Sequence, residues 1–113
     1  MIYSSELLKG TLKTIILKLL ADNKKMYGYE MTQMVKNISQ DRIQITEGSL
    51  YPLLHILERE GFVTTKNEYI GKRLRKYYSL SHDGKKETKE KVKEMTDFMS
   101  TMAQLLSIKI KTI

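Results

Sequence analysis

The 113-residue chain has no cysteine, no tryptophan and only one proline. The absence of cysteine excludes disulfides, thiolate metal sites and cysteine nucleophiles, although it leaves the redox compartment open. Long apolar runs are also missing, because the longest one near the start, Ile15-Ile16-Leu17, is bracketed by Lys13 and Lys18. A secretory signal needs an apolar stretch of ~7–15 residues, and a membrane-spanning helix needs ~20. We therefore expect a cytoplasmic protein that makes no membrane contact.

Positive charge is the main compositional feature. Lysine and arginine number 20 against 13 acidic residues, which gives a net charge of +7. Residues 66–76 hold five basic residues and one acidic residue, so this short segment alone contributes +4. A concentrated basic patch is a better sign of nucleic-acid binding than a diffuse excess. A solvated basic loop is the alternative explanation for a single cluster of this size.

The first part of the chain predicts two amphipathic helices. Apolar residues spaced by three and four place the first at about residues 5–21 and the second at about 28–38. Ser4 or Ser5 can cap the start of the first helix. Gly10 is expected to weaken that helix by ~1 kcal/mol relative to alanine.

A third helix is predicted to start after Thr46, which is a good N-cap, and to end before Gly61, which suits the position after a helix. Pro52 falls in its second turn, where it costs a backbone hydrogen bond that a bent first turn would relieve. Ile43 and Ile45 alternate in the polar link before this helix. Their alternation favours one short strand there.

Two β-branched and aromatic runs, at residues 62–65 and 76–80, follow the third helix and predict strands. The segment between them, residues 67–75, contains Gly71. We expect a β-hairpin whose tip is basic.

The last predicted helix begins after Ser81, which can cap it. Glu87 and Lys91 are spaced to form a supporting i, i+4 pair. A heptad-like apolar seam then follows, and a helix with such a seam and nothing after it needs a partner. The simplest partner is a second copy in an isologous contact, which the start of the first helix would join. The predicted dimer residues are Leu8, Val92, Met95, Met99, Met102 and Leu106.

The order of helix, helix, helix, hairpin and helix is that of a winged helix-turn-helix, so the fold class is mainly α with a small β-hairpin. In such a fold the third helix enters the major groove of DNA and the hairpin forms the wing. We expect residues 1–81 to form the DNA-binding domain and residues 82–113 to form the dimerisation helix.

The candidate DNA-binding residues lie on the third helix and the wing. With the leucines facing inward, the outer stripe of the third helix is slim and holds no acidic residue at its centre. Its hydroxyl and imidazole groups can bond to phosphates or base edges. An ordinary amphipathic helix with a mixed solvent face is the alternative. The candidates are Gly48, Ser49, Tyr51, Pro52 and His55 on the helix, and Lys72, Arg73, Arg75 and Lys76 on the wing.

Five stretches, in order along about residues 6–85, resemble the PadR family of bacterial transcriptional regulators. The short C-terminal segment resembles the compact PadR subfamily. The five stretches are Leu8-Lys9-Gly10-Thr11-Leu12, Tyr27-Gly28-Tyr29-Glu30, Glu47-Gly48-Ser49-Leu50-Tyr51-Pro52, Leu57-Glu58-Arg59-Glu60-Gly61 and Arg75-Lys76-Tyr77-Tyr78-Ser79-Leu80.

The resemblance implies a homodimeric winged-helix repressor that binds an inverted repeat in double-stranded DNA. It places residues 48–52 on the recognition helix and Tyr29 near a phosphate, and it makes residues 72–76 the wing. Some compact members sense flat aromatic drugs at the dimer centre, using an aromatic residue on the last helix. Met95 and Met99 occupy that region here, so the sequence gives no support for a small-molecule inducer.

Other functions are weaker candidates. A winged helix can also organise DNA, for instance in plasmid segregation, or bind protein through its wing. Catalysis has little support, because the only histidines, His55 and His82, lie on different predicted elements. There is no glycine-rich phosphate loop and no metal-ligand spacing. We expect no catalytic residue, no cofactor and no metal.

Overall fold

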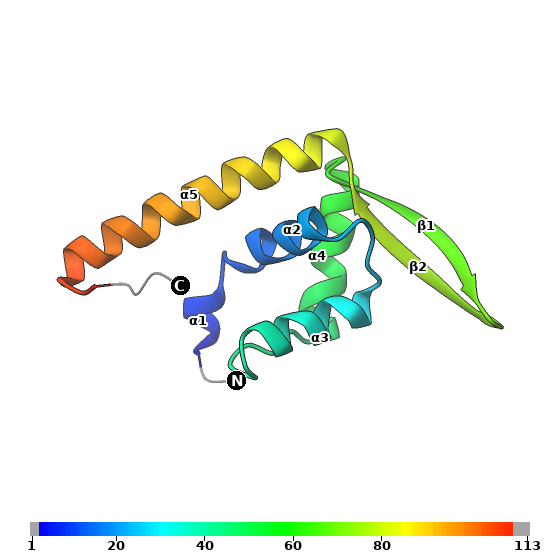
Figure 1. The fold of residues 1–113 in the computed structure, drawn as a ribbon, viewed down its shortest axis with the longest axis horizontal. Coiled ribbons are helices and arrows are strands. Elements are labelled where there is room, and N and C mark those ends of the chain that lie inside the picture. Colours follow the sequence, from blue (N-terminus) through cyan, green and yellow to red (C-terminus); the bar gives the residue numbers. More distant parts are fainter. Residues whose placement is uncertain (1–2, 110–113) are drawn as a thin grey trace.

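A computed structural model describes residues 3–109, so the outer ends of the two predicted domains, residues 1–2 and 110–113, lie outside the described residues. The structure confirms the predicted fold class, a winged helix-turn-helix followed by a long helix (Figure 1). It measures 54 × 29 × 25 Å, because the wing and the last helix extend in opposite directions from a small body. The elements are α1 (Ser5–Leu8), α2 (Leu12–Asp22), α3 (Gly28–Ile38), α4 (Glu47–Arg59), β1 (Val63–Ile70), β2 (Arg73–Leu80) and α5 (His82–Leu106).

The body is a three-helix core closed by the base of the hairpin. Each of α2, α3 and α4 turns one apolar stripe inward, as the helical spacing of their apolar residues requires. Val63 and Tyr78 bring the base of the hairpin into the same cluster. This core fixes the orientation of α4 and the root of the wing. Its fully buried helical side chains are Ile16, Leu17, Met31, Leu50, Leu54 and Leu57.

The prediction of a single first helix at residues 5–21 is wrong, because the helix is interrupted between α1 and α2. Gly10 has φ = +88°, a left-handed conformation that other residues rarely adopt. The Thr11 hydroxyl donates to the carbonyl of Leu8 at 2.6 Å and closes the end of α1. Gly10 therefore ends one helix rather than weakening it.

The third predicted helix is confirmed as α4. The Thr46 side chain accepts a hydrogen bond from the Ser49 amide at 3.2 Å, and Gly61 after the helix has φ = +82°. The helix runs through Pro52 without interruption.

The short strand expected around Ile43 and Ile45 is wrong. These residues lie in an extended loop whose side chains pack against the core. The place beside β2 is taken instead by Met26, which exchanges two backbone hydrogen bonds with Tyr78 at 3.0 and 2.8 Å.

The hairpin is longer than predicted. Residues 67–75 were expected to form its tip, but β1 and β2 pair continuously from Val63↔Leu80 to Ile70↔Arg73. Only Gly71 and Lys72 remain in the turn. Gly71 has φ = +64°, as a two-residue hairpin turn with glycine first requires. The wing is therefore a slender arm with a narrow end (Figure 1).

The last helix, α5, begins as predicted, with the Ser81 side chain accepting from the Gly84 amide at 3.0 Å. Its first half packs along α2, with Gly84 and Thr88 buried. The predicted Glu87–Lys91 pair is wrong, because Glu87 reaches across to Lys13 on α2 at 3.0 Å. The second half of α5 projects away from the body (Figure 1). Within residues 3–109 no helix is both long and apolar enough to cross a membrane.

Candidate nucleic-acid interface

The outward face of α4 is solvent-exposed. Because Leu50, Leu54 and Leu57 are buried against the body, the opposite stripe must face solvent. The Thr46 hydroxyl also donates to the Ser49 hydroxyl at 3.1 Å, which fixes the start of the helix. The exposed stripe consists of Gly48, Ser49, Tyr51, Pro52, His55 and Arg59.

The wing keeps most of its positive charge unneutralised. Among the ion pairs of residues 3–109, none involves Lys72, Arg73 or Arg75. Lys76 lies 3.8 Å from the Glu58 carboxylate in an exposed pair, and such pairs contribute little to stability. The wing is therefore free to attract a polyanion.

Tyr27 at the start of α3 anchors the root of the wing. The Arg75 guanidinium lies 4.3 Å from the centre of its ring, and the Tyr77 ring meets it edge-on at 5.6 Å. Cation–π and edge-to-face contacts of this kind restrict the side chains involved. Arg75 is thus held in place at the junction between the wing and the helix-turn-helix.

A second contact ties the wing to the loop before α3. The Lys25 ammonium lies 2.6 Å from the Glu68 carboxylate on β1, and this hydrogen bond raises the pKa of Lys25. The contact also offsets the only acidic charge of the basic segment. The remaining cations of the wing are therefore not opposed by Glu68.

A depression of about 240 Å³ joins the wing, the start of α3 and α4. Tyr29 is 63% exposed beside it, and Tyr78 forms part of its floor. Burial raises the pKa of Tyr78 above 10.0, so its hydroxyl stays neutral at physiological pH. The depression brings together Tyr27, Gly28, Tyr29, Tyr51, Leu74, Arg75, Lys76 and Tyr78.

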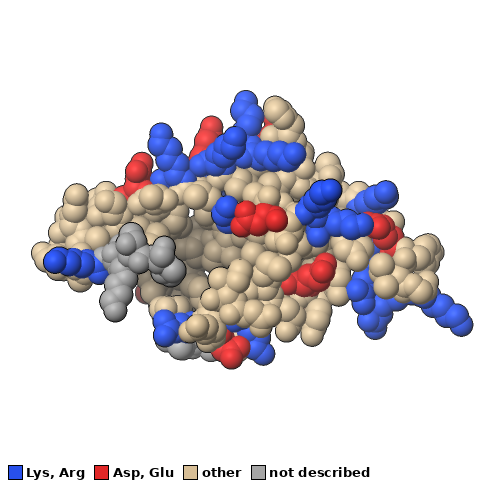
Figure 2. Space-filling model, viewed as in Figure 1, with Lys and Arg blue, Asp and Glu red and all other residues tan. Residues whose placement is uncertain are grey.

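The remaining candidates lie outside this depression. Gly48, Ser49, Pro52 and His55 are on the exposed face of α4, Lys72 is in the turn of the wing, and Arg73 begins β2. Figure 2 shows lysine and arginine side chains around the wing and also along α5. The α5 lysines were not among the sequence candidates and alternate with acidic residues on that helix.

The sequence analysis missed Tyr27, Tyr69 and Leu74. The contact of Tyr27 with Arg75 depends on the tertiary fold, and no local pattern predicts it. The sequence predicts a hairpin tip over residues 67–75, whereas Tyr69 and Leu74 are paired strand residues. Gly71-Lys72 is the sequence signal for a two-residue turn with glycine first, which implies longer strands on both sides.

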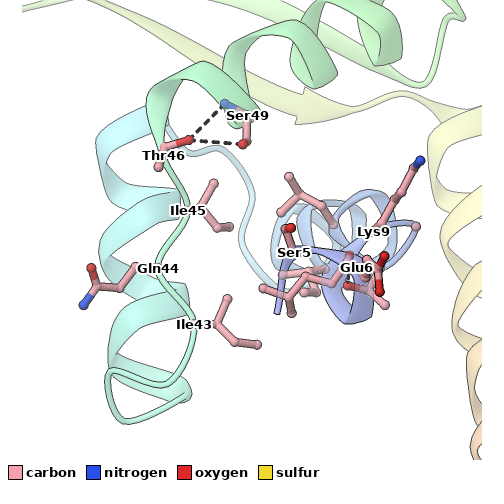
Figure 3. Close-up of a pocket in the computed structure, with 13 residues that line it drawn as sticks. Ser5, Glu6, Lys9, Ile43, Gln44, Ile45, Thr46 and Ser49 are labelled. Carbon is pink, nitrogen blue, oxygen red and sulfur yellow. Dashed lines mark hydrogen bonds between the residues drawn. The ribbon is translucent and has the colours of Figure 1, made fainter. Parts of the chain in front are cut away.

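A groove of about 570 Å³ lies on the other side of the start of α4, between α1, the start of α2 and the loop before α4 (Figure 3). Its walls are mostly apolar. Ile43 and Ile45 point into it from the loop, and Ser5, Glu6 and Lys9 lie on the α1 side. Ser49 reaches its edge, so the groove adjoins the start of α4.

No group of histidine, cysteine, aspartate and glutamate within residues 3–109 could hold a metal ion. His55 on α4 and His82 at the start of α5 lie on separate elements.

Comparisons with known proteins agree with the winged helix-turn-helix fold. The model of the transcriptional regulator PadR-like family matches residues 16–90. A protein of Lysinibacillus sphaericus, named only as uncharacterized protein X, is 34% identical over 96 residues, which cover 82% of this chain and 85% of that protein. A transcriptional regulator from Clostridium thermocellum has a similar structure, with a TM-score of 0.81 and 27% identity over 88% of this chain and 97% of that one.

A PadR family transcriptional regulator from Eggerthella lenta is also similar, with a TM-score of 0.78 and 27% identity over 92% of this chain and 88% of that one. The fold and the family match together define a winged-helix transcriptional regulator, a class that implies DNA binding. The chain belongs to the PadR-like family of transcriptional regulators, and its single long C-terminal helix matches the small members of known structure.

Proposed function

We propose that this protein represses transcription as a homodimer bound to an inverted-repeat operator. The observation that carries the proposal is the convergence of the exposed α4 face, Tyr29 and the basic wing on one side of the body. Residues 1–81 form the DNA-binding part, and residues 82–113 form the dimerisation part.

The recognition helix α4 lies in the major groove. Its first turn carries Gly48 and Ser49, which leave room for close approach and offer a hydroxyl to phosphates or bases. Pro52 adds little bulk to the contact face, and His55 can donate or accept at a base edge. Tyr51 faces the depression, where its hydroxyl adjoins Tyr29 and the wing.

Gly28→Ala tests whether Tyr51 contacts DNA, because it should displace the Tyr51 side chain without unfolding the protein. A Cβ at Gly28 would collide with the Tyr51 hydroxyl, the far end of a flexible side chain. Tyr51 can swing away, so unfolding in urea should change by less than about 1 kcal/mol. Affinity for DNA should fall roughly tenfold, as expected for the loss of one hydrogen bond to a charged phosphate. Unchanged affinity would remove Tyr51 from the interface.

The wing neutralises phosphates beside the major-groove site. Lys72, Arg73, Arg75 and Lys76 each supply one positive charge, and an arginine suits a narrow minor groove. Arg75 is the best positioned of them, because Tyr27 holds its guanidinium at the junction.

The second half of α5 forms the dimer interface. Two of its apolar side chains are largely uncovered by the rest of residues 3–109: Met99 is 46% exposed and Leu106 is 60% exposed. Val92, Met95 and Met102 continue the same seam and are half-buried. Leu8 joins the interface from α1, where the apolar groove of Figure 3 gives a second copy a surface for the exposed end of its α5.

The test uses duplexes that the full-length protein selects from a randomised library. Wild-type protein should bind a selected duplex with a Kd of ~10⁻⁸–10⁻¹¹ M and a scrambled duplex of equal length far more weakly. Arg73→Ala should weaken binding to both duplexes and reduce the salt slope by about one unit. Lys86→Ala, which removes an exposed lysine of α5, is the matched control and should leave the slope unchanged.

Equal affinity for selected and scrambled DNA would contradict the repressor and support a DNA-organising module. A dimer without salt-dependent DNA binding would support a protein-binding role. Repression itself is read from a reporter gene placed behind the selected duplex.

A further inference from the structure

The end of the wing carries large apolar side chains in water. Tyr69 is 73% exposed, Leu74 is 52% exposed and Ile70 is 49% exposed. All three lie beside the two-residue turn. Single exposed apolar residues need no explanation, but three together at the end of a thin arm form a patch that favours a partner.

The strand register divides this patch between two faces. Tyr69 and Leu74 are directly opposite each other, so their Cβ atoms are ~4.5–5.5 Å apart on one face of the hairpin. Ile70 points to the other face, because successive side chains of a strand alternate. Tyr69 and Leu74 therefore act as a pair, and Ile70 does not belong to it.

The face that carries the pair is the one that meets the recognition helix. Thr65, which lies on this face four residues closer to the body than Tyr69, donates a hydrogen bond to Glu58 of α4 at 3.0 Å. Lys76 on the same face lies 3.8 Å from Glu58. Leu74 also lines the depression that contains Tyr51 of α4. The apolar pair is thus continuous with the proposed DNA surface.

The chemistry around the pair specifies its occupant. Lys72 in the turn and Lys76 on the same face surround the pair with positive charge, and the turn is narrow because Gly71 has no side chain. A surface with cations at the rim and apolar groups at the centre fits a polyanion with an apolar interior. The minor groove of DNA has this character: phosphates line its edges, and stacked bases and sugars form its inside.

We propose that Tyr69 and Leu74 form an apolar wedge that enters the minor groove next to the α4 site and pushes apart one base step. This inference rests on the proposed function and extends it. The wing would deform DNA with its apolar side chains as well as bind phosphates with its basic ones. Inserted apolar side chains bend duplexes by roughly 20–90°. The wedge would also select flexible pyrimidine–purine steps, which are the least costly to open.

The experiment measures the bend of a selected duplex labelled with a dye at each end, in complex with full-length protein. A 2-aminopurine at each successive step reports where bases lose their stacking. The test variants are Leu74→Ala and Tyr69→Ala. Ile70→Ala is the matched control, because it removes a similarly exposed apolar side chain from the opposite face of the same tip. Thermal unfolding checks that each variant is folded.

Each test variant should reduce the bend and the 2-aminopurine signal and lower affinity about tenfold, the change expected when a buried leucine side chain is lost. Ile70→Ala should behave as wild type. If both test variants bend and bind DNA as wild type does, the wedge proposal is wrong and the apolar tip would contact a protein partner instead. Equal losses in all three variants would also overturn it. In either case, Arg73→Ala still weakening DNA binding would show that the proposed function stands.

Discussion

Met99→Glu combined with Leu106→Glu is expected to convert the proposed dimer into a folded monomer and to lower affinity for an inverted-repeat duplex by at least about a hundredfold. The two side chains are 46% and 60% exposed in the single chain, so their replacement leaves the core of the body untouched. In an isologous interface each charge is buried twice, once from each copy. Two linked DNA-binding domains also bind far more tightly than one, by a factor of ~10²–10⁴.

The matched control is Thr101→Glu combined with Gln104→Glu. It adds the same two charges to α5 at exposed positions on the side opposite Met99. This control should sediment as a dimer and bind DNA as wild type does. A dimeric Met99→Glu, Leu106→Glu variant with normal affinity would show that the copies associate through another surface.

Gly84→Ala is expected to cause the largest loss of stability of any single methyl addition in the chain. Gly84 is buried in the first turn of α5, and a Cβ there would lie well inside contact distance of the Phe62 carbonyl oxygen. Because that atom belongs to the backbone, it cannot rotate away, and α5 must shift from the hairpin root. Overpacking of this kind costs about 3 kcal/mol, to be measured by urea unfolding.

Gly48→Ala is the control for this change. Gly48 is also a helical glycine, but the nearest atom to an added Cβ is the Thr46 side-chain oxygen at 3.9 Å. The substitution should raise the free energy of unfolding by about 0.5–1 kcal/mol, because alanine favours helix over glycine. If Gly84→Ala were as stable as wild type, the docking of α5 on the hairpin root would be wrong.

The parts of the fold that were predicted correctly depend on local chemistry. Thr46 and Ser81 cap helices through hydrogen bonds to residues three positions later, and such contacts can be seen in the sequence. Some of the errors come from long-range contacts. Met26 pairs with Tyr78 of β2, and no local pattern around Met26 predicts this contact.

The same division holds for the interface. The outer stripe of α4 follows from helical spacing once the leucines are known to face inward. The position of Arg75 over Tyr27 does not, because the two residues are far apart in sequence and meet only through the fold. Glu87 likewise forms its ion pair with Lys13 on α2 and not with Lys91 on its own helix. Partners across elements compete with local pairs, and sequence spacing alone does not rank them.

The central claim is that two copies read DNA together, and genomic footprinting of the full-length protein tests it most directly. The account predicts protected sites with two-fold symmetry, whose half-site centres lie about one helical turn, or ~34 Å, apart. Protection of isolated half-sites, or uniform coverage without preferred sequences, would contradict it.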